Sequence, residues 1–146
     1  MLFQKILIAV EDSPHSLEAA QAGIQLARKV NAEIAVMCAI NIGVTIASPE
    51  VVPTPIEIIN VQREEAHTVL EKVKALYDGE RPIHEFTPEG DPREEIVAVA
   101  EEWGAHIIVL GTHGRTGLTH LLMGSTAEYV VRHSRVPVLV VPMKKN

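Results

Sequence analysis

The sequence contains few of the residue types on which several kinds of protein depend. It has a single cysteine, Cys38, so no disulfide can form within the chain, and its place in an apolar run predicts a buried thiol. Its aromatic residues are two phenylalanines, two tyrosines and one tryptophan among 146 residues. Because 47% of the chain is nevertheless hydrophobic, we expect a core built from aliphatic side chains.

Basic residues are also scarce. The chain has 13 Lys and Arg against 19 Asp and Glu, which gives a formal charge of −6, and no basic run is longer than Lys144-Lys145. Binding to nucleic acid requires clustered Lys and Arg that neutralise phosphates. We therefore predict no nucleic-acid partner.

The chain also lacks the long apolar run that a membrane span requires, which is roughly 20 residues. The amino terminus enters an apolar strand containing Lys5, without the pattern of a secretory signal. We expect a cytoplasmic protein with no membrane contact. A length of 146 residues fits one domain, residues 1–146.

The chain does contain four runs that are apolar at consecutive positions, and helical patterns separate them. Continuous apolar runs are typical of strands that are covered on both faces of a parallel sheet. A weaker strand at residues 83–86 contains two polar residues, which favours an edge position. The four runs are residues 6–10, 34–40, 107–110 and 136–141.

The helical segments carry start signals of their own. Ser13-Pro14 and Asp91-Pro92 each combine an N-capping side chain with a proline at the first helical position, and a fourth helix begins at Ser125. Alternating strands and helices predict an α/β fold, a Rossmann-like five-stranded parallel sheet in the order 3-2-1-4-5 with helices on both faces. Residues 43–60, which include three prolines, fit neither element, and we interpret them as a variable surface loop or as a lid or partner-binding segment.

A glycine-rich segment follows the strand at residues 107–110. Gly111 and Gly114 form a loop after this strand, and Gly124-Ser125 opens the last helix. Glycine lets backbone amides approach a ligand, and a helix start adds unpaired N–H groups and a positive dipole end. Together they predict a phosphate site at the topological switch between the first and fourth strands, where ligands bind in such sheets. The alternative is structural, because Ser125 and Glu128 have the spacing of a capping box.

The spacing differs from the common phosphate motifs, because no lysine precedes Ser125 and the glycines do not follow G-x-G-x-x-G. The pattern that remains, G-x-x-G-x9-G-[ST], resembles the ATP-binding signature of the universal stress protein family. The resemblance extends over nearly the whole chain. It includes Glu11-Asp12-Ser13, Gly90-Asp91-Pro92, Val131-Arg132-His133 and the closing run from Pro137 to Val141.

The resemblance implies a ligand and its site. The ligand would be ATP, AMP or ADP, with Mg²⁺ held through the phosphates. The family usually has Asp where this chain has Glu11, and valine where it has Ala39. Glu11 therefore has two possible roles, a contact with the ribose or a place in a solvated turn. The phosphates would bind at Gly111, Gly114, Gly124, Ser125 and Thr126, with His113 and Arg115 in the loop, and the nucleoside at Val10, Glu11 and Ala39.

Three functions remain open from the sequence. The first is a nucleotide-binding regulatory protein of the stress response. The second is a slow ATPase, although the chain lacks S-G-G-x-D-S, H-I-G-H, a carboxylate cluster and metal-ligand spacing, so we assign no catalytic or metal-binding residue. The third is a nucleotide-free dimeric scaffold. We also expect a homodimer through the strand at residues 136–141, because an apolar edge strand needs a cover, and protein partners that the sequence does not identify.

Overall fold

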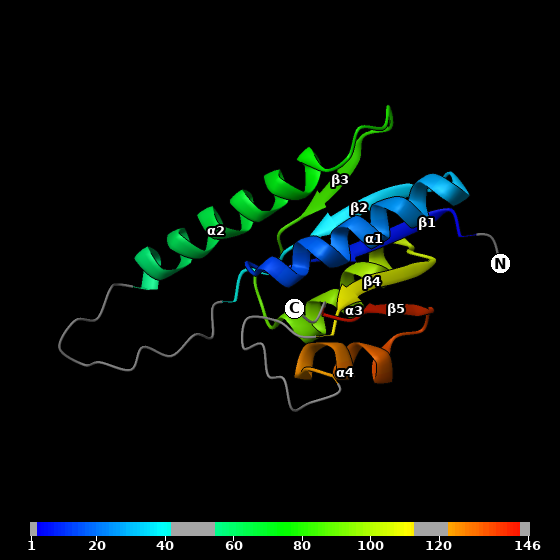
Figure 1. The fold of residues 1–146 in the computed structure, drawn as a ribbon. Coiled ribbons are helices and arrows are strands. Elements are labelled where there is room, and N and C mark those ends of the chain that lie inside the picture. Colours follow the sequence, from blue (N-terminus) through cyan, green and yellow to red (C-terminus); the bar gives the residue numbers. More distant parts are fainter. Residues whose placement is uncertain (1–2, 42–54, 113–122, 144–146) are drawn as a thin grey trace.

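A computed structural model describes residues 3–41, 55–112 and 123–143 of the chain (Figure 1). The described residues form a sheet of parallel strands with helices on both faces. In chain order the elements are β1 (Lys5–Ala9), α1 (Pro14–Val30), β2 (Glu33–Met37), α2 (Pro55–Ala75), β3 (Ile83–Phe86), α3 (Pro92–Trp103), β4 (Ile107–Gly111), α4 (Ser125–His133) and β5 (Val138–Val141).

The five strands lie in the order β3-β2-β1-β4-β5, and every pair is parallel. This confirms the predicted fold class and order, including the edge position of β3. In the centre, Ile6 of β1 pairs with Ile34 of β2 on one side and with Ile107 of β4 on the other. The chain thus leaves β1 toward one edge of the sheet and returns to fill the other edge, so the strand order reverses at β1 and β4.

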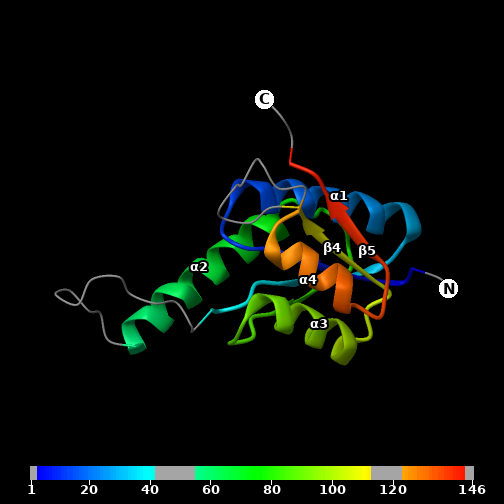
Figure 2. The same ribbon diagram turned by 90° about the horizontal axis from the view of Figure 1, so that it is seen from below.

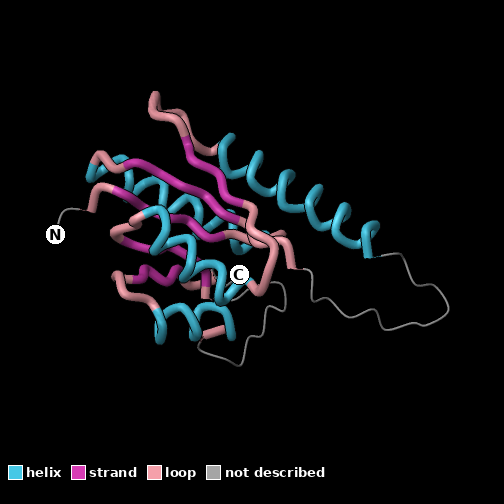
Figure 3. The backbone as a smooth tube through the Cα atoms, turned by 180° about the vertical axis from the view of Figure 1, so that it is seen from behind, coloured by secondary structure: helices cyan, strands magenta, loops and turns pink. Residues whose placement is uncertain are grey.

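Alternate residues of each apolar run enter two separate cores. Ile6 and Ile8 face α1 and α2, whereas Leu7 and Ala9 face α3 and α4. Figure 2 shows the two helix pairs on opposite faces of the sheet, and Figure 3 shows the strands between them from behind. Because both faces are covered, each central strand is apolar at consecutive positions, which explains the sequence pattern.

The predicted start signals of α1 and α3 are present. The Ser13 hydroxyl accepts a hydrogen bond from the Ser16 backbone N–H at 3.3 Å, and Pro14 is the first helical residue. The Asp91 carboxylate accepts one from the Arg93 N–H at 2.9 Å, and Pro92 follows it directly. These caps fix the point at which the chain turns from a strand end into each helix.

Three predicted boundaries are wrong. The second strand was expected at residues 34–40, but β2 ends at Met37, because β1 turns away after Val10 and leaves β2 without a partner on that side. Ile40 keeps a single bridge, to Glu89. The last strand begins at Val138 and not at residue 136, since the Val136 N–H donates to the Ser134 hydroxyl at 3.1 Å instead of to a strand.

The third error concerns residues 43–60, which we expected to be irregular. Residues 43–54 lie outside the described part of the chain, but α2 begins at Pro55. A proline in the first turn costs no hydrogen bond, so Pro55 starts the helix where we read it as a breaker. The first turns of α2 extend beyond the sheet (Figure 1), and Ile56 and Val61 are exposed there. Among the described residues, no helix combines the length and apolarity needed to cross a membrane.

One glycine of α1 sets how closely this helix approaches the sheet. Gly23 is buried, and a Cβ atom at this position would lie 2.8 Å from both Cγ1 and Cδ1 of Ile8 in β1. The helix therefore lies directly on the central strand only because residue 23 has no side chain.

We predict that Gly23→Val lowers the free energy of unfolding by about 1–3 kcal/mol, because the added side chain overpacks the contact between α1 and β1. The measurement is urea unfolding followed by circular dichroism. Gln25→Val is the matched control, since Gln25 is exposed in the same helix and its replacement should change stability by less than about 0.5 kcal/mol. Equal losses in the two variants would contradict the close contact.

Candidate functional site

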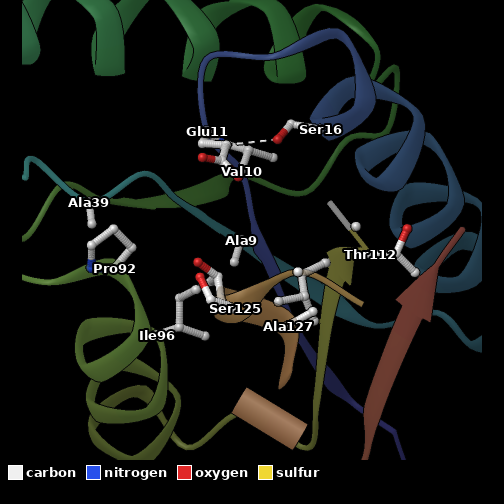
Figure 4. Close-up of a pocket in the computed structure, with 14 residues that line it drawn as sticks. Ala9, Val10, Glu11, Ser16, Ala39, Pro92, Ile96, Thr112, Ser125 and Ala127 are labelled. Carbon is white, nitrogen blue, oxygen red and sulfur yellow. Dashed lines mark hydrogen bonds between the residues drawn. The ribbon is translucent and has the colours of Figure 1, made fainter. Parts of the chain in front are cut away.

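A cavity of about 190 Å³ lies beyond the carboxyl ends of β1 and β4, where the strand order reverses. Its walls come from segments that are far apart in the sequence (Figure 4). In open α/β sheets this is the place where ligands bind. The lining residues are Ala9, Val10, Glu11, Ser16, Ala39, Pro92, Ile96, Leu110, Gly111, Thr112, Gly124, Ser125, Thr126 and Ala127.

One wall is the start of α4. Gly124 is the N-cap, and its carbonyl accepts the first helical hydrogen bond, from the Glu128 N–H at 3.0 Å. The N–H groups of the next three residues, Ser125 to Ala127, have no acceptor within the helix, because they precede its first full turn. All three residues line the cavity. The cavity therefore meets the positive end of a helix dipole and a set of converging backbone donors.

The capping-box interpretation of Ser125 is wrong. The capping position belongs to Gly124, and Ser125 is the first helical residue, so its hydroxyl is not the cap of α4. In Figure 4, Ser125 lies beside Ile96 of α3 at the cavity. A glycine N-cap leaves the helix end open to a ligand, since no side chain covers the first N–H groups.

Backbone hydrogen bonds join the two ends of the glycine-rich segment. The Gly124 N–H donates to the Thr112 carbonyl at 2.6 Å, and the Thr112 N–H donates to the Val141 carbonyl at 3.0 Å. These bonds place the end of β4 next to the start of α4, although residues 113–122, outside the described part of the chain, come between the two in the sequence. His113, Gly114 and Arg115, which we predicted for the site, lie outside the described residues.

The opposite wall is the turn from β1 into α1. The Glu11 backbone N–H donates to the Ser16 hydroxyl at 2.9 Å, a bond drawn in Figure 4. Ser16 is the only buried polar residue among those described, with 6% of its surface exposed. Its hydroxyl also lies 3.4 Å from that of Ser13. Ser16 therefore holds the turn that presents Glu11 to the cavity.

A third part of the cavity wall is the chain at Ala39, after the end of β2, where backbone groups face the cavity. The N–H groups of Cys38 and Ile40 donate to the carbonyls of Phe86 and Pro88, at 3.1 and 2.8 Å. Successive residues of an extended chain direct their peptide groups to opposite sides. Ala39 therefore faces the side that β1 has left, which is the cavity side.

The start of α3 forms the remaining wall of the cavity and contacts α4. The Arg93 side chain donates to the Asp91 carboxylate at 2.9 and 3.2 Å, and these hydrogen bonds hold the pKa of Asp91 below its ordinary value of 3.8. The Arg93 guanidinium also lies 5.7 Å from the ring centroid of Tyr129 in α4. This cation–π contact joins the two helices whose starts, at Pro92 and Ser125, line the cavity.

A smaller cavity of about 100 Å³ adjoins the first and shares Glu11, Ala39 and Pro92 with it. It also has the carboxylates of Asp12 and Glu65 in its wall, so the Glu11 end of the site is acidic. Within the described residues, no group of three or more His, Cys, Asp or Glu side chains is arranged to hold a metal ion.

The structure brings together most of the residues that the sequence singled out, and it adds others. The added residues include a buried serine, a threonine directly after β4, and a proline and aliphatic side chains in the first turns of helices, and the sequence predicted none of them as a site residue. Only the predicted topology could have indicated these residues, since each follows or faces a strand end at the point where the strand order reverses. The predicted residues that line the cavity are Val10, Glu11, Ala39, Gly111, Gly124, Ser125 and Thr126, and the added ones include Ser16, Pro92, Ile96, Thr112 and Ala127.

The sequence also matches a known family and its members. The model of the universal stress protein family matches residues 2–142. Universal stress protein MJ0531 of Methanocaldococcus jannaschii is 37% identical over 147 residues, which cover 99% of this chain and 85% of that protein. The solved structure of MJ0577 from the same organism has a TM-score of 0.81 and 30% identity, with full coverage of both chains.

Two further similar structures were solved with ligands. A universal stress protein in complex with cAMP is 26% identical, with a TM-score of 0.67 and coverage of 97% of this chain and 98% of that one. The universal stress protein of Archaeoglobus fulgidus in complex with dAMP is 19% identical, with a TM-score of 0.64 and coverage of 97% and 99%. The second likeness is one of fold alone.

We predict that Ser16→Ala lowers the free energy of unfolding by roughly 1–2 kcal/mol, because the Glu11 N–H loses its acceptor. Amide hydrogen exchange measured by NMR should become faster at Glu11. Val10 is the internal control, since its N–H donates to the Met37 carbonyl at 2.9 Å and should stay protected. Unchanged exchange at Glu11 would show that Ser16 does not hold the turn.

Proposed function

The chain belongs to the universal stress protein family, and on this basis we propose that residues 1–146 form one domain that binds an adenine nucleotide and acts as a regulatory protein of the stress response. One observation carries the proposal. The backbone donors of α4, the carboxylate of Glu11 and the backbone at Ala39 surround a single cavity at the switch point of the sheet.

The phosphates are assigned to the start of α4. Phosphate oxygens accept hydrogen bonds from converging N–H groups, and the helix dipole favours negative charge at this end. Ser125 and Thr126 add hydroxyl groups, and Gly111 and Gly124 leave the backbone accessible. In this proposal Gly114, His113 and Arg115 complete the phosphate site, and any Mg²⁺ is held through the phosphates.

The nucleoside is assigned to the other end of the cavity. Glu11 accepts hydrogen bonds from ribose hydroxyls, and the backbone near Val10 and Ala39 recognises the base. Its surroundings are aliphatic, with Ile96 and Pro92 from α3 in the wall. This arrangement of a small number of polar groups in an apolar cavity is typical of small-molecule sites. The cAMP complex of a similar protein supports an adenine nucleotide as the ligand.

Ligand binding by a small regulatory domain needs an output, and we propose that β5 provides it as a dimer interface. β5 is an edge strand, and Leu139 on it is 37% exposed. The carbonyls of Pro137 and Val141 accept hydrogen bonds from the N–H groups of Ile108 in β4 and of Thr112 directly after it, so the peptide groups of Val138 and Val140 face outward. A second copy, antiparallel about a two-fold axis, would pair with these outward groups. The same strand end contacts Thr112 at the cavity, which couples the interface to the site.

We predict that Ser125→Asp abolishes nucleotide binding while the fold stays intact. The new carboxylate lies at a helix start, where the dipole stabilises it, but it repels phosphate. Ser125→Asn is the matched control, because it has nearly the same shape without the charge. Isothermal titration with AMP should show binding for wild type and for Ser125→Asn only. Binding of equal strength to Ser125→Asp would place the phosphate elsewhere.

For the interface, we predict that Val140→Pro converts a dimer to a monomer, because proline removes an outward N–H group without breaking a hydrogen bond to β4. Val140→Thr keeps this N–H and should remain dimeric. Light scattering coupled to size exclusion gives the mass of each variant. A wild type that is already monomeric at high concentration would refute the interface.

A further inference from the structure

We propose that the outer edge of β3 binds an extended peptide segment of a partner protein, in which basic and apolar residues alternate, and that this segment pairs with β3 as an additional strand. This edge lies at the opposite side of the sheet from β5 (Figure 1). Three features of the described residues support a peptide here: a row of outward backbone groups, a groove on one face of that row, and aromatic rings on the other.

The backbone row is longer than β3 itself. Beyond Phe86 the chain stays extended as far as Glu89, which forms a parallel bridge with Ile40 in the register of the β2–β3 pair. The carbonyls of Phe86 and Pro88 accept hydrogen bonds from the Cys38 and Ile40 N–H groups, so these two residues direct their peptide groups inward. Successive residues of an extended chain alternate in this respect. The residues with outward peptide groups are therefore Ile83, Glu85, Thr87 and Glu89.

The position of the proline in this stretch leaves the outer row intact. Edge strands are often protected from pairing by a proline whose missing N–H falls on the open side. Pro88 has the opposite placement, because its peptide group faces the β2 side. All four outward residues keep an N–H donor and a carbonyl acceptor. An alternating row of donors and acceptors at this spacing matches the backbone of another extended chain.

A groove of about 460 Å³ lies beside this edge, between β3 and α2. The side chains of the outward residues 85, 87 and 89 point to this face, since alternate residues of a strand share a face. A strand that pairs with β3 would place every second side chain in the groove. The lining residues are Ile40, Arg63, His67, Leu70, Glu85, Thr87 and Glu89.

The two carboxylates of the groove favour basic residues in the ligand. Glu89 pairs with Arg63, and Glu85 lies 3.3 Å from the Lys74 ammonium group. Each printed contact uses one carboxylate oxygen, whereas an ionised carboxylate has about four acceptor positions. A cationic side chain of the ligand can therefore bind the same carboxylates without breaking these ion pairs. Because Thr87 lies midway between the two carboxylates, a matching strand has basic residues four positions apart and a small polar residue between them.

The other face of the same edge is aromatic. His84 and Phe86 point to this face, and their ring centroids lie 5.6 and 6.5 Å from that of Trp103 at the end of α3. Phe86 and Trp103 are half-buried at the border of the core between the sheet and α3. The remaining side chains of an added strand would lie beside these rings, and aromatic rings pair well with β-branched residues across strands. Apolar residues therefore alternate with the basic ones.

The same carboxylates disfavour a second copy of this chain at this edge. Antiparallel pairing about a two-fold axis at Glu85 would place this carboxylate opposite that of the other copy, and an axis at Thr87 would place Glu85 opposite Glu89. Like charges directly opposite each other are destabilising. The formal charge of −6 also favours a cationic ligand over a second copy.

The first test uses the capped peptide acetyl-Val-Arg-Val-Thr-Val-Arg-Val-amide and a matched control peptide with glutamate in place of both arginines. Each is titrated calorimetrically into the full-length protein. We expect the arginine peptide to bind at least about tenfold more tightly than the glutamate peptide, because only the first has charges complementary to the groove. Equal affinities, or no binding of the arginine peptide, would overturn the proposal.

Backbone methylation of the peptide separates strand pairing from charge attraction alone. One derivative carries N-methyl groups on the arginine and threonine residues, and the other carries them on the three central and terminal valines. In a paired strand one of these sets faces β3 and the other faces solvent. We expect one derivative to lose binding and the other to retain it. The same affinity for both would refute pairing with β3.

Amide hydrogen exchange measured by NMR locates the peptide. The Glu85, Thr87 and Glu89 amides should exchange rapidly in the free protein and become protected when the arginine peptide binds. Phe86 is the internal control, because its peptide group faces β2 and should be protected in both states. Outward amides that are already protected in the free protein would show that another part of the chain or a second copy covers this edge, and the proposal would be wrong.

A pair of double variants tests the role of the carboxylates. Glu85→Gln combined with Glu89→Gln should reduce the preference for the arginine peptide to less than about threefold, since the backbone row remains but the charges are gone. Glu101→Gln combined with Glu128→Gln is the matched control. These carboxylates also pair with arginines, at 3.4 and 2.9 Å, but lie on α3 and α4, and their loss should leave the preference unchanged. An equal reduction in both double variants would contradict binding at β3.

Discussion

The parallel pairing of β1 with β4 is the constraint on which the rest of the structure depends. Ile6, Leu7 and Ile8 pair with Ile107, Ile108 and Val109 in the middle of the sheet, and both faces of this pair are buried. Because β2 and β3 already occupy the other side of β1, the crossover that leads to β4 runs in the opposite direction along the sheet. Parallel crossovers are right-handed, so this one lies on the opposite face from α1 and α2. The two sets of helices diverge where the strand order reverses, and the space between their connections is the cavity.

The residues that follow β1 and β4 decide which chemical groups face this cavity. β1 ends in a turn that Ser16 holds through the Glu11 N–H, and β4 ends at a segment whose base is closed by the bond from Gly124 to Thr112. The first turn presents a carboxylate, and the second presents the open start of α4. A ligand that spans the two must combine hydrogen-bond donors with a negative group, which is the chemistry of a nucleotide. The proposed function follows from this asymmetry.

The amino-acid sequence predicted the sheet because the patterns that indicate strands and helix starts are strong and depend on neighbouring residues. Strands buried on both faces must be apolar throughout, and Ser13-Pro14 and Asp91-Pro92 start helices by direct steric and hydrogen-bonding effects. The errors arose where tertiary partners decide the outcome. β2 ends at Met37 because β1 leaves it, and Pro55 starts a helix because its missing N–H is harmless in a first turn. At the site, the glycine spacing identified the α4 wall, whereas the role of Ser16 depends on a contact that no spacing encodes.

The central claim is that the start of α4 binds the phosphate of an adenine nucleotide. Backbone amide NMR measures this directly, with AMP and adenosine titrated separately into the same labelled protein. The claim predicts that AMP shifts the amide resonances of Ser125, Thr126 and Ala127 strongly, whereas adenosine shifts mainly those near Glu11 and Ala39. Equal shifts with the two ligands at the α4 amides, or AMP shifts confined to another surface, would contradict it.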